Sequence, residues 1–148
     1  MIVVPYRDRL NDLRVFSTNL HNFLINQYRS YCLVLSEQSD KSDFNRAKLL
    51  NVGFREGNKH FMESTKTQIK YETRPDCIIF SDVDLIPENY GNLHACLQTT
   101  AVHMCDKINK YGYKAQFIAG ELFSSGGVLS VSRKMYENIN GHSNWYWS

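Results

Sequence analysis

Residues 1–38 constrain the fold more than any other part of this sequence. The apolar segment 2–6 (IVVPY) has the length and composition of a short buried strand. From Asp8 onward, large apolar residues recur every three or four positions up to Leu24, which predicts an amphipathic helix with Asp8 as its N-cap. Residues 31–38 (YCLVLSEQ) form a second strand pattern. Strand, helix and strand make a βαβ unit, so we expect a parallel sheet with a right-handed crossover.

The rest of the sequence continues this alternation of strands and helices. The further elements that we expect are a helix at 44–60 that opens near Asn45, a strand at 76–82, a short helical stretch within 92–109, a strand at 126–132 and a short helix at 133–139. Residues 39–43 and 62–75 are polar and are expected to be loops. A length of 148 residues without repeats or linkers predicts one α/β domain.

Composition excludes several classes of protein. The chain has 17 basic and 15 acidic residues, and the basic ones are scattered, so there is no electrostatic basis for binding nucleic acid. No stretch approaches the roughly 20 apolar residues of a membrane-spanning helix. The first residues also lack the features of a secretory signal. Because the sequence opens directly on a strand and stops abruptly after NWYWS, we expect it to be part of a longer protein.

Two aspartates follow the apolar strand in IIFSDVDLIP (78–87). Ligands of open α/β sheets bind beyond the carboxyl ends of the strands, where Asp82 and Asp84 are expected. Residues two apart in an extended segment point to the same side, so both carboxylates can face one site. Such hard oxygen ligands suit Mg²⁺ or Mn²⁺ completed by substrate phosphates. The alternative is a polar turn in which Asp82 caps the strand and Asp84 is solvated.

A phosphatase of the haloacid-dehalogenase type also places D-x-D after an apolar strand, with the first aspartate as nucleophile. That class has Thr or Val shortly after the second aspartate, where this chain has Leu85 and Ile86, and no later acidic pair is present. The sequence therefore does not favour the phosphatase hypothesis.

Basic residues favour a nucleoside-diphosphate-sugar site instead. Arg7 and Arg9 follow the first strand, and Asn45 and Arg46 open the second helix. All four are expected at the sheet edge that carries the aspartates. Guanidinium groups and a helix N-terminus beside phosphate would bind a diphosphate.

Five segments together resemble the β-1,4-galactosyltransferases. They are VVPYRDR, FNRAKLLNVGF, DCIIFSDVDLIP, GGVLSVS and INGHSNWYW, in the order and approximate spacing of that family, over nearly the whole chain. The resemblance implies a GT-A-like nucleotide-sugar-binding domain with a mainly parallel central sheet, of which 1–148 is an N-terminal portion. It implies a Golgi type II membrane enzyme, anchored by a segment that is not in this sequence. The enzyme would transfer galactose or N-acetylgalactosamine from a UDP-sugar to terminal N-acetylglucosamine, with inversion and Mn²⁺.

The resemblance also implies roles for individual residues. Donor binding is implied for Pro5, Tyr6, Arg7, Arg9, Phe44, Arg46, Asp82, Val83, Lys110 and Gly127. Asp84 is implied as the metal ligand. Gly126 and Gly127 would let the backbone approach donor and acceptor closely.

The cysteines take their expected roles from the resemblance. Four cysteines without a CxxC pair argue against a zinc knuckle, and their number alone leaves thiols and a disulfide open. The family's lumenal setting implies a disulfide between Cys77 and Cys96, which would close a loop of about 20 residues and stabilise by roughly 3 kcal/mol. Cys32 and Cys105 are expected to be thiols.

Two departures from the family affect function. The family continues beyond this chain into W-G-x-E-D-D, which supplies the general base, and into further metal ligands; here Ser148 stands where Gly is usual. We therefore expect no useful sugar transfer by these residues alone. Ser124 lies where the family often has Tyr, which predicts that the full-length enzyme accepts UDP-N-acetylgalactosamine. The alternative is a non-catalytic truncated protein or pseudoenzyme that binds UDP-sugar.

Overall fold

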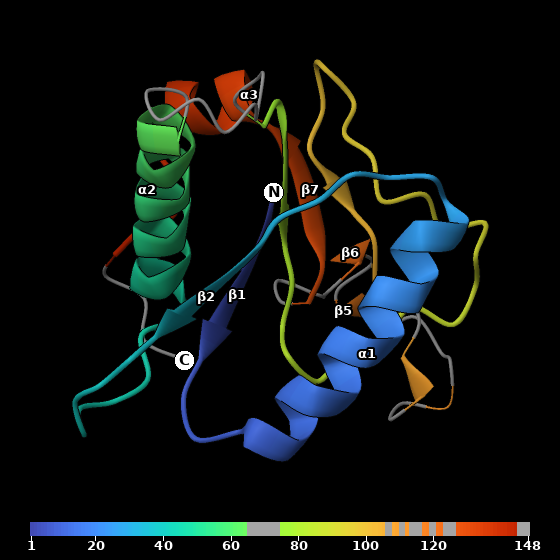
Figure 1. The fold of residues 1–148 in the computed structure, drawn as a ribbon, viewed down its shortest axis with the longest axis horizontal. Coiled ribbons are helices and arrows are strands. Elements are labelled where there is room, and N and C mark those ends of the chain that lie inside the picture. The colour runs from blue at the N-terminus through green and yellow to red at the C-terminus, as the bar shows by residue number, and fades with distance from the viewer. Residues whose placement is uncertain are drawn as a thin grey trace.

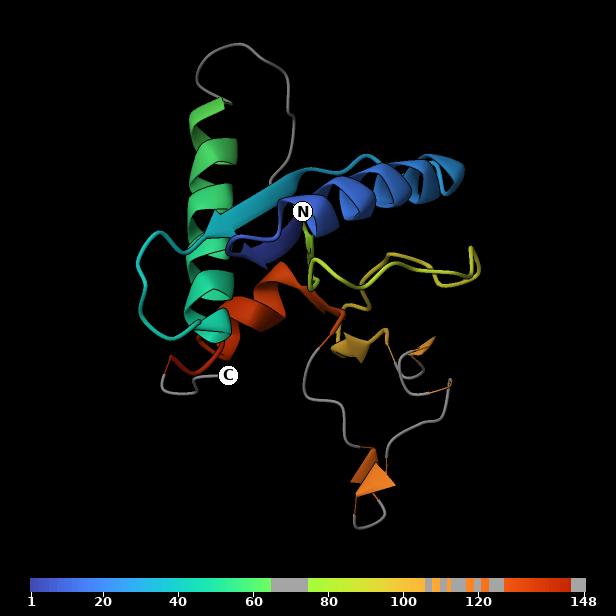
Figure 2. The ribbon, with the colours of Figure 1, turned by 90° about the horizontal axis from the view of Figure 1, so that it is seen from below.

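The computed structural model describes residues 1–64, 75–105, 108–109, 112, 117–118, 121–122 and 127–144. Its centre is a five-stranded sheet in the order β2-β1-β3-β7-β4 (Figure 1). The strands are β1 (Ile2–Tyr6), β2 (Leu33–Glu37), β3 (Cys77–Phe80), β4 (Val102–His103) and β7 (Leu129–Ser132). Strands β5 (Phe117–Ile118) and β6 (Glu121–Leu122) pair separately and stand apart from this sheet (Figure 2).

Helices cover both faces of the sheet. They are α1 (Leu10–Asn26), α2 (Arg46–Ser64) and α3 (Arg133–Asn138). On β1, Ile2 and Val4 pack against α1, while Val3 faces α2, because successive side chains of a strand point to opposite faces. Helix α2 lies close to β1 at Gly53, where a Cβ atom would come within 2.5 Å of the Val3 side chain.

The sheet is mixed, with its parallel part at the N-terminal end of the chain. Strand β1 pairs in parallel with β2 and with β3, which confirms the parallel pattern expected there. Strand β7 runs antiparallel to β3, and β4 runs antiparallel to β7. Parallel neighbours need a long crossover, usually a helix. Between β3 and β7 the described residues contain no α-helix, so the antiparallel direction of β7 fits the connection that precedes it.

Two local predictions are wrong. Asp8 does not cap α1: its φ is +52°, and Arg9 is the N-cap residue, without a side-chain capping bond. The helical stretch expected around 92–109 is not found in the described part of that range, which contains no α-helix and includes strand β4. The start of α2 is confirmed. The Asn45 Oδ1 atom accepts a hydrogen bond of 2.8 Å from the backbone N–H of Lys48, as an N-cap does.

Helix α2 also extends beyond the expected end at residue 60, to Ser64. Within the described part of the chain, no helix combines the length and the apolar character that crossing a membrane requires.

Candidate nucleotide-sugar site

A cavity of about 410 Å³ lies where β1 and β3 end and α2 begins. It is lined by Pro5, Arg7, Arg9, Phe44, Arg46, Asp82, Val83 and Asp84. These residues come from three separate parts of the sequence, and all of them were expected to bind donor or metal. The carboxyl ends of parallel strands are the usual location of a ligand site in such a sheet.

Other expected site residues are not part of this cavity lining. Tyr6 is 7% exposed and packs in the core on the α1 side. Gly127 lies next to the cavity, where its backbone N–H donates to Asp82. Lys110, Ser124 and Gly126 lie outside the described residues.

Asp82 connects three elements of the fold. Its Oδ1 accepts a hydrogen bond of 2.6 Å from Arg46 Nε, at the start of α2. Its Oδ2 accepts a bond of 3.0 Å from the backbone N–H of Gly127, which precedes β7. The guanidinium of Arg46 also donates to the Gly127 carbonyl at 3.3 Å. Gly127 has φ +100°, a conformation that favours glycine. Both Asp82 oxygens are thus engaged by the chain itself.

Asp84 has a different environment, although it is only two residues away. The chain turns between the two aspartates, and the Leu85 N–H donates to the Asp82 carbonyl at 3.3 Å. Asp84 Oδ2 accepts a bond of 2.7 Å from Arg9 Nη1, and both side chains are 49% exposed. This contact raises the pKa of Arg9. Arg9 Nε also lies 3.1 Å from Asp12 Oδ2.

Arg7 and Phe44 form a second pair in the cavity. The Arg7 guanidinium carbon lies 5.3 Å from the centre of the Phe44 ring, within the range of a cation–π interaction. Arg7 Nη1 also donates to the Ser42 carbonyl at 2.6 Å. The pair joins a charged group to a flat apolar one, a combination suited to a nucleotide.

Gln38, which follows β2 directly, orders the loop that carries Phe44. Its Nε2 donates to Asp40 Oδ1 at 2.9 Å and to two backbone carbonyls of the loop, and its Oε1 accepts from the Asn45 N–H at 3.0 Å. The bond from Gln38 is the main reason that the pKa of Asp40 is lowered. Sequence reasoning missed Gln38, although its position after a strand end was a usable signal.

Asn51, also missed, fixes the described segment 141–144 on α2. Its Nδ2 donates to the His142 carbonyl at 2.8 Å, and its Oδ1 accepts from the Tyr136 hydroxyl at 2.6 Å. Burial raises the pKa of Tyr136 to about 12. Burial, with the nearby charge of Arg46, lowers the pKa of His142.

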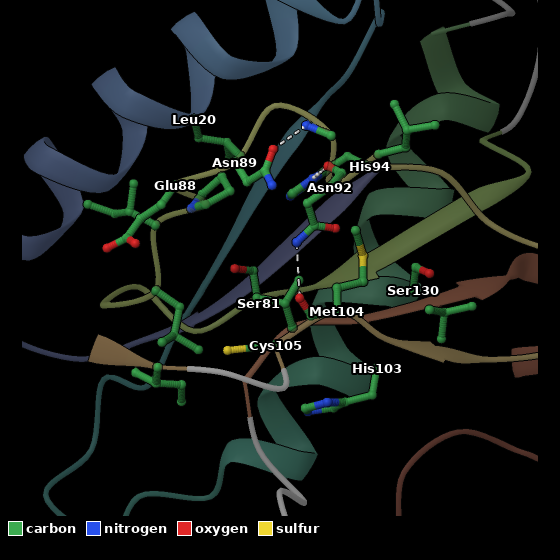
Figure 3. A pocket seen from close by; sticks show the side chains of 18 of the residues that line it. Leu20, Ser81, Glu88, Asn89, Asn92, His94, His103, Met104, Cys105 and Ser130 are labelled. Atoms are coloured by element: carbon green, nitrogen blue, oxygen red, sulfur yellow. Dashed lines mark hydrogen bonds between the residues drawn. The ribbon is translucent and has the colours of Figure 1, made fainter. Parts of the chain in front are cut away.

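A second cavity, of about 960 Å³, lies between α1, the segment after β3, and β4 and β7 (Figure 3). Its walls include the fully buried Ser130, and Asn92 closes one side by donating to the Met104 carbonyl at 3.0 Å. Asp84 lines this cavity as well as the smaller one. A group bound at Asp84 would therefore be in reach of both cavities.

The side chains of the 410 Å³ cavity supply only part of a metal-binding site. Among the described residues there is no group of three His, Cys, Asp or Glu side chains that could hold one. Asp84 is the carboxylate that faces the cavity with one oxygen not engaged by Arg9. It fits as a single hard oxygen ligand to Mn²⁺, to be completed by phosphate oxygens or by further ligands.

The cysteines are arranged as expected. Cys77 and Cys96 form a disulfide with an S–S distance of 2.08 Å, and Cys32 and Cys105 are thiols, as expected. The disulfide joins the start of β3 to the segment that lines the larger cavity.

The fold and the site define a GT-A-type domain, since the structural neighbours are galactosyltransferase catalytic domains of that type. The chain belongs to the glycosyl transferase group 7 family: residues 1–97 match the family described as "N-terminal region of glycosyl transferase group 7". This confirms the resemblance to β-1,4-galactosyltransferases.

Similar proteins extend the match to almost the whole chain. Human beta-1,4-galactosyltransferase 4 is 38% identical over 146 residues, covering 99% of this chain and 38% of that protein. Human beta-1,4-galactosyltransferase 3 is 36% identical over the same length, 33% of that protein. The crystal structure of a mutant Drosophila beta-1,4-galactosyltransferase 7, in complex with manganese, UDP-Gal and xylobiose, superposes with a TM-score of 0.75 at 30% identity. The match covers 99% of this chain and 53% of that one.

Proposed function

We propose that this chain is the donor-binding part of a UDP-sugar-dependent β-1,4-glycosyltransferase and that the 410 Å³ cavity binds the UDP group. One observation carries the proposal: Arg7, Arg9 and Arg46 converge with Phe44 and Asp84 on one cavity at the strand ends. Three guanidinium groups beside one another favour a diphosphate over a neutral ligand. The complex of the Drosophila relative with manganese and UDP-Gal supports this ligand class.

Different residues of the cavity would contact different parts of the UDP-sugar donor. Phe44, backed by Arg7, offers a flat apolar surface to the base. The other two arginines face the phosphates. Asp84 would be one ligand of Mn²⁺, which when bound neutralises charge on the departing UDP. Asp82 acts through Arg46 and Gly127, whose positions it fixes.

The finer parts of the function follow the family. We propose that the full-length protein transfers galactose, or N-acetylgalactosamine if Ser124 stands at the donor-selecting position, to terminal N-acetylglucosamine. We propose the Golgi lumen as its location, with a type II anchor. The Cys77–Cys96 disulfide supports an oxidising compartment.

The 148 residues by themselves are proposed to bind UDP-sugar without transferring the sugar. This second proposal is favoured by the ligands of the 410 Å³ cavity, where Asp84 has one carboxylate oxygen that Arg9 does not bond. The described residues also contain no group of three His, Cys, Asp or Glu side chains that could hold a metal ion. Weak metal binding would leave the leaving group without its counter-charge.

Titration calorimetry of the 148-residue chain with UDP, UMP and ADP, each with and without Mn²⁺, tests the proposal. We expect UDP to bind best and to depend on Mn²⁺. A radiolabelled UDP-galactose assay with an N-acetylglucosamine acceptor should detect no transfer. Failure of UDP to bind at millimolar concentration, or equal binding of ADP and UDP, contradicts donor binding. Transfer by the chain contradicts the second proposal.

A further inference from the structure

Arg9 is bonded to the carboxylate that the proposed function assigns to the metal. Its Nη1 lies 2.7 Å from Asp84 Oδ2, whereas Arg7 bonds a backbone carbonyl and Arg46 bonds Asp82. Among the arginines of the cavity, Arg9 is therefore the one paired with Asp84. A metal ion on the same carboxylate would be repelled by the guanidinium beside it.

We propose that Arg9 couples metal binding to donor binding, an inference that rests on the proposed function. Without metal, Arg9 neutralises Asp84. When Asp84 takes a divalent cation, Arg9 gives up that bond, and its Nη1 edge becomes available to the donor diphosphate. Binding of either ligand then favours the other.

The exposure of the ion pairs allows this exchange. Arg9 and Asp84 are each 49% exposed, so water and ions reach the pair, and an exposed pair contributes little to stability. The Arg46–Asp82 pair is 23% and 26% exposed and is supported by Gly127. Of these two pairs, Arg9–Asp84 is therefore the one whose separation costs little free energy.

Asp12 gives Arg9 a second partner that does not depend on Asp84. Asp12 Oδ2 lies 3.1 Å from Arg9 Nε. The backbone of Arg9 is also fixed, because its carbonyl accepts the first hydrogen bond of α1 from the Leu13 N–H at 2.9 Å. The guanidinium would therefore stay at the cavity edge when it leaves Asp84. The N-terminus of α1 is beside it, which also favours an anion there.

The test compares Arg9→Gln with Arg7→Gln in the 148-residue chain. Both variants remove one positive charge from the same cavity, but only the first removes the partner of Asp84. Free Mn²⁺ is measured by its EPR signal, with and without UDP, and circular dichroism checks folding. Without UDP, we expect Arg9→Gln to bind Mn²⁺ about two- to fivefold more tightly than wild type, the size expected of an exposed ion pair.

The coupling supplies the second readout. We expect UDP to increase Mn²⁺ affinity by a smaller factor in Arg9→Gln than in wild type, and Mn²⁺ to increase UDP affinity by the same smaller factor, because such coupling is reciprocal. Arg7→Gln should weaken UDP binding and keep the coupling. If Arg9→Gln does not fold, Arg9→Lys, a shorter cation that loses the planar contact, should show the same two changes at smaller size.

Equal gains in Mn²⁺ affinity in the two Gln variants would indicate a general charge effect and overturn the inference. So would wild-type coupling in Arg9→Gln. In either case a wild-type chain that binds UDP with Mn²⁺ leaves the proposed function intact. A wild-type chain that binds neither ligand overturns the proposed function, and this inference with it.

Discussion

The β1–β3 region (residues 1–64 and 75–84) and the 85–105 segment build the two cavities in different ways. In the first region, every residue of β1 is buried and paired with a neighbouring strand, and the cavity side chains project from strand ends and a helix start. The 85–105 segment contains only the two-residue strand β4 and exposes large apolar side chains, namely Ile86, Tyr90, Leu93 and Leu97.

The 85–105 segment is instead held by a few contacts. The disulfide attaches Cys96 to β3, and Gln27 at the end of α1 donates to the carbonyls of Tyr90 and Asn92 at 3.1 Å each. A donor cavity on regular elements is fixed by the same packing that stabilises the fold. A cavity wall held by isolated contacts depends on each of them. Four predictions test this difference.

Removal of the disulfide should have the largest effect on stability. The Cys77→Ala/Cys96→Ala variant opens a link between residues 19 apart in sequence, for which the chain-entropy estimate is about 3 kcal/mol. Urea unfolding without reductant measures the loss. Cys32→Ser, which removes a free thiol, is the control and should cost less. Cys96 holds the 85–105 segment, whereas the proposed UDP cavity is lined by residues of the β1–β3 region. UDP binding by the folded variant should therefore change little. A large loss of UDP affinity would show that the two regions do not differ in this way.

Removal of the Asp82 carboxylate should come next. Asp82→Ala leaves Arg46 and the Gly127 N–H without their acceptor, in a place where the side chains are about one-quarter exposed. We expect a loss of about 2 kcal/mol in the free energy of unfolding, since each abandoned polar group costs on the order of 1 kcal/mol. Asp82→Asn, which keeps one acceptor oxygen, should lose less. An unchanged urea midpoint for Asp82→Ala would show that the three elements are not held together at this point.

Asp84→Ala should change stability by less than about 1 kcal/mol, because its ion pair with Arg9 is half exposed. It should nevertheless abolish the Mn²⁺ dependence of UDP binding. Calorimetry with and without Mn²⁺ measures this, and Asp82→Asn is the matched control that keeps Asp84. Mn²⁺-dependent binding that survives in Asp84→Ala would mean that the metal ligand lies elsewhere.

The β1–β3 region was also the part that the sequence predicted best. The strand at 2–6 matches β1, and the Asn45 cap marks the start of α2, because a short apolar run and a capping residue are local signals. Asp8 was misjudged because a capping residue has extended backbone, whereas φ here is +52°. The sequence does not reveal such a turn, which depends on how β1 meets α1.

The 85–105 segment was predicted poorly for a physical reason. Strand β4 is two residues long and exists through pairing with β7, with Val102 opposite Ser130. A pairing partner so distant in sequence leaves no periodic signal. The spacing of the two aspartates alone suggested that both could face one metal site, whereas the family motif assigned only Asp84 to the metal. The spacing could not show the bonds that Asp82 makes, because its partners Arg46 and Gly127 lie far away in the sequence.

The smallest expected effect is a pH dependence that originates in the 85–105 segment. His94 is 8% exposed, and its ring packs edge-on against Phe23. Its backbone N–H donates to Gln27 Oε1 at 3.1 Å. Burial lowers the pKa of His94 below the ordinary 6.5. The unfolded chain therefore takes up the proton first as pH falls. Stability contributed by neutral His94 is present above pH 6.5 and is lost between 6.5 and the lower folded pKa.

His94→Gln should lose less stability than wild type between neutral pH and about pH 5, a window set by the ordinary histidine pKa. His142, whose pKa is lowered in the same direction, keeps part of the slope in both proteins. Urea midpoints for the two proteins across this range measure the difference, and identical slopes would show that the packing of His94 does not limit its protonation.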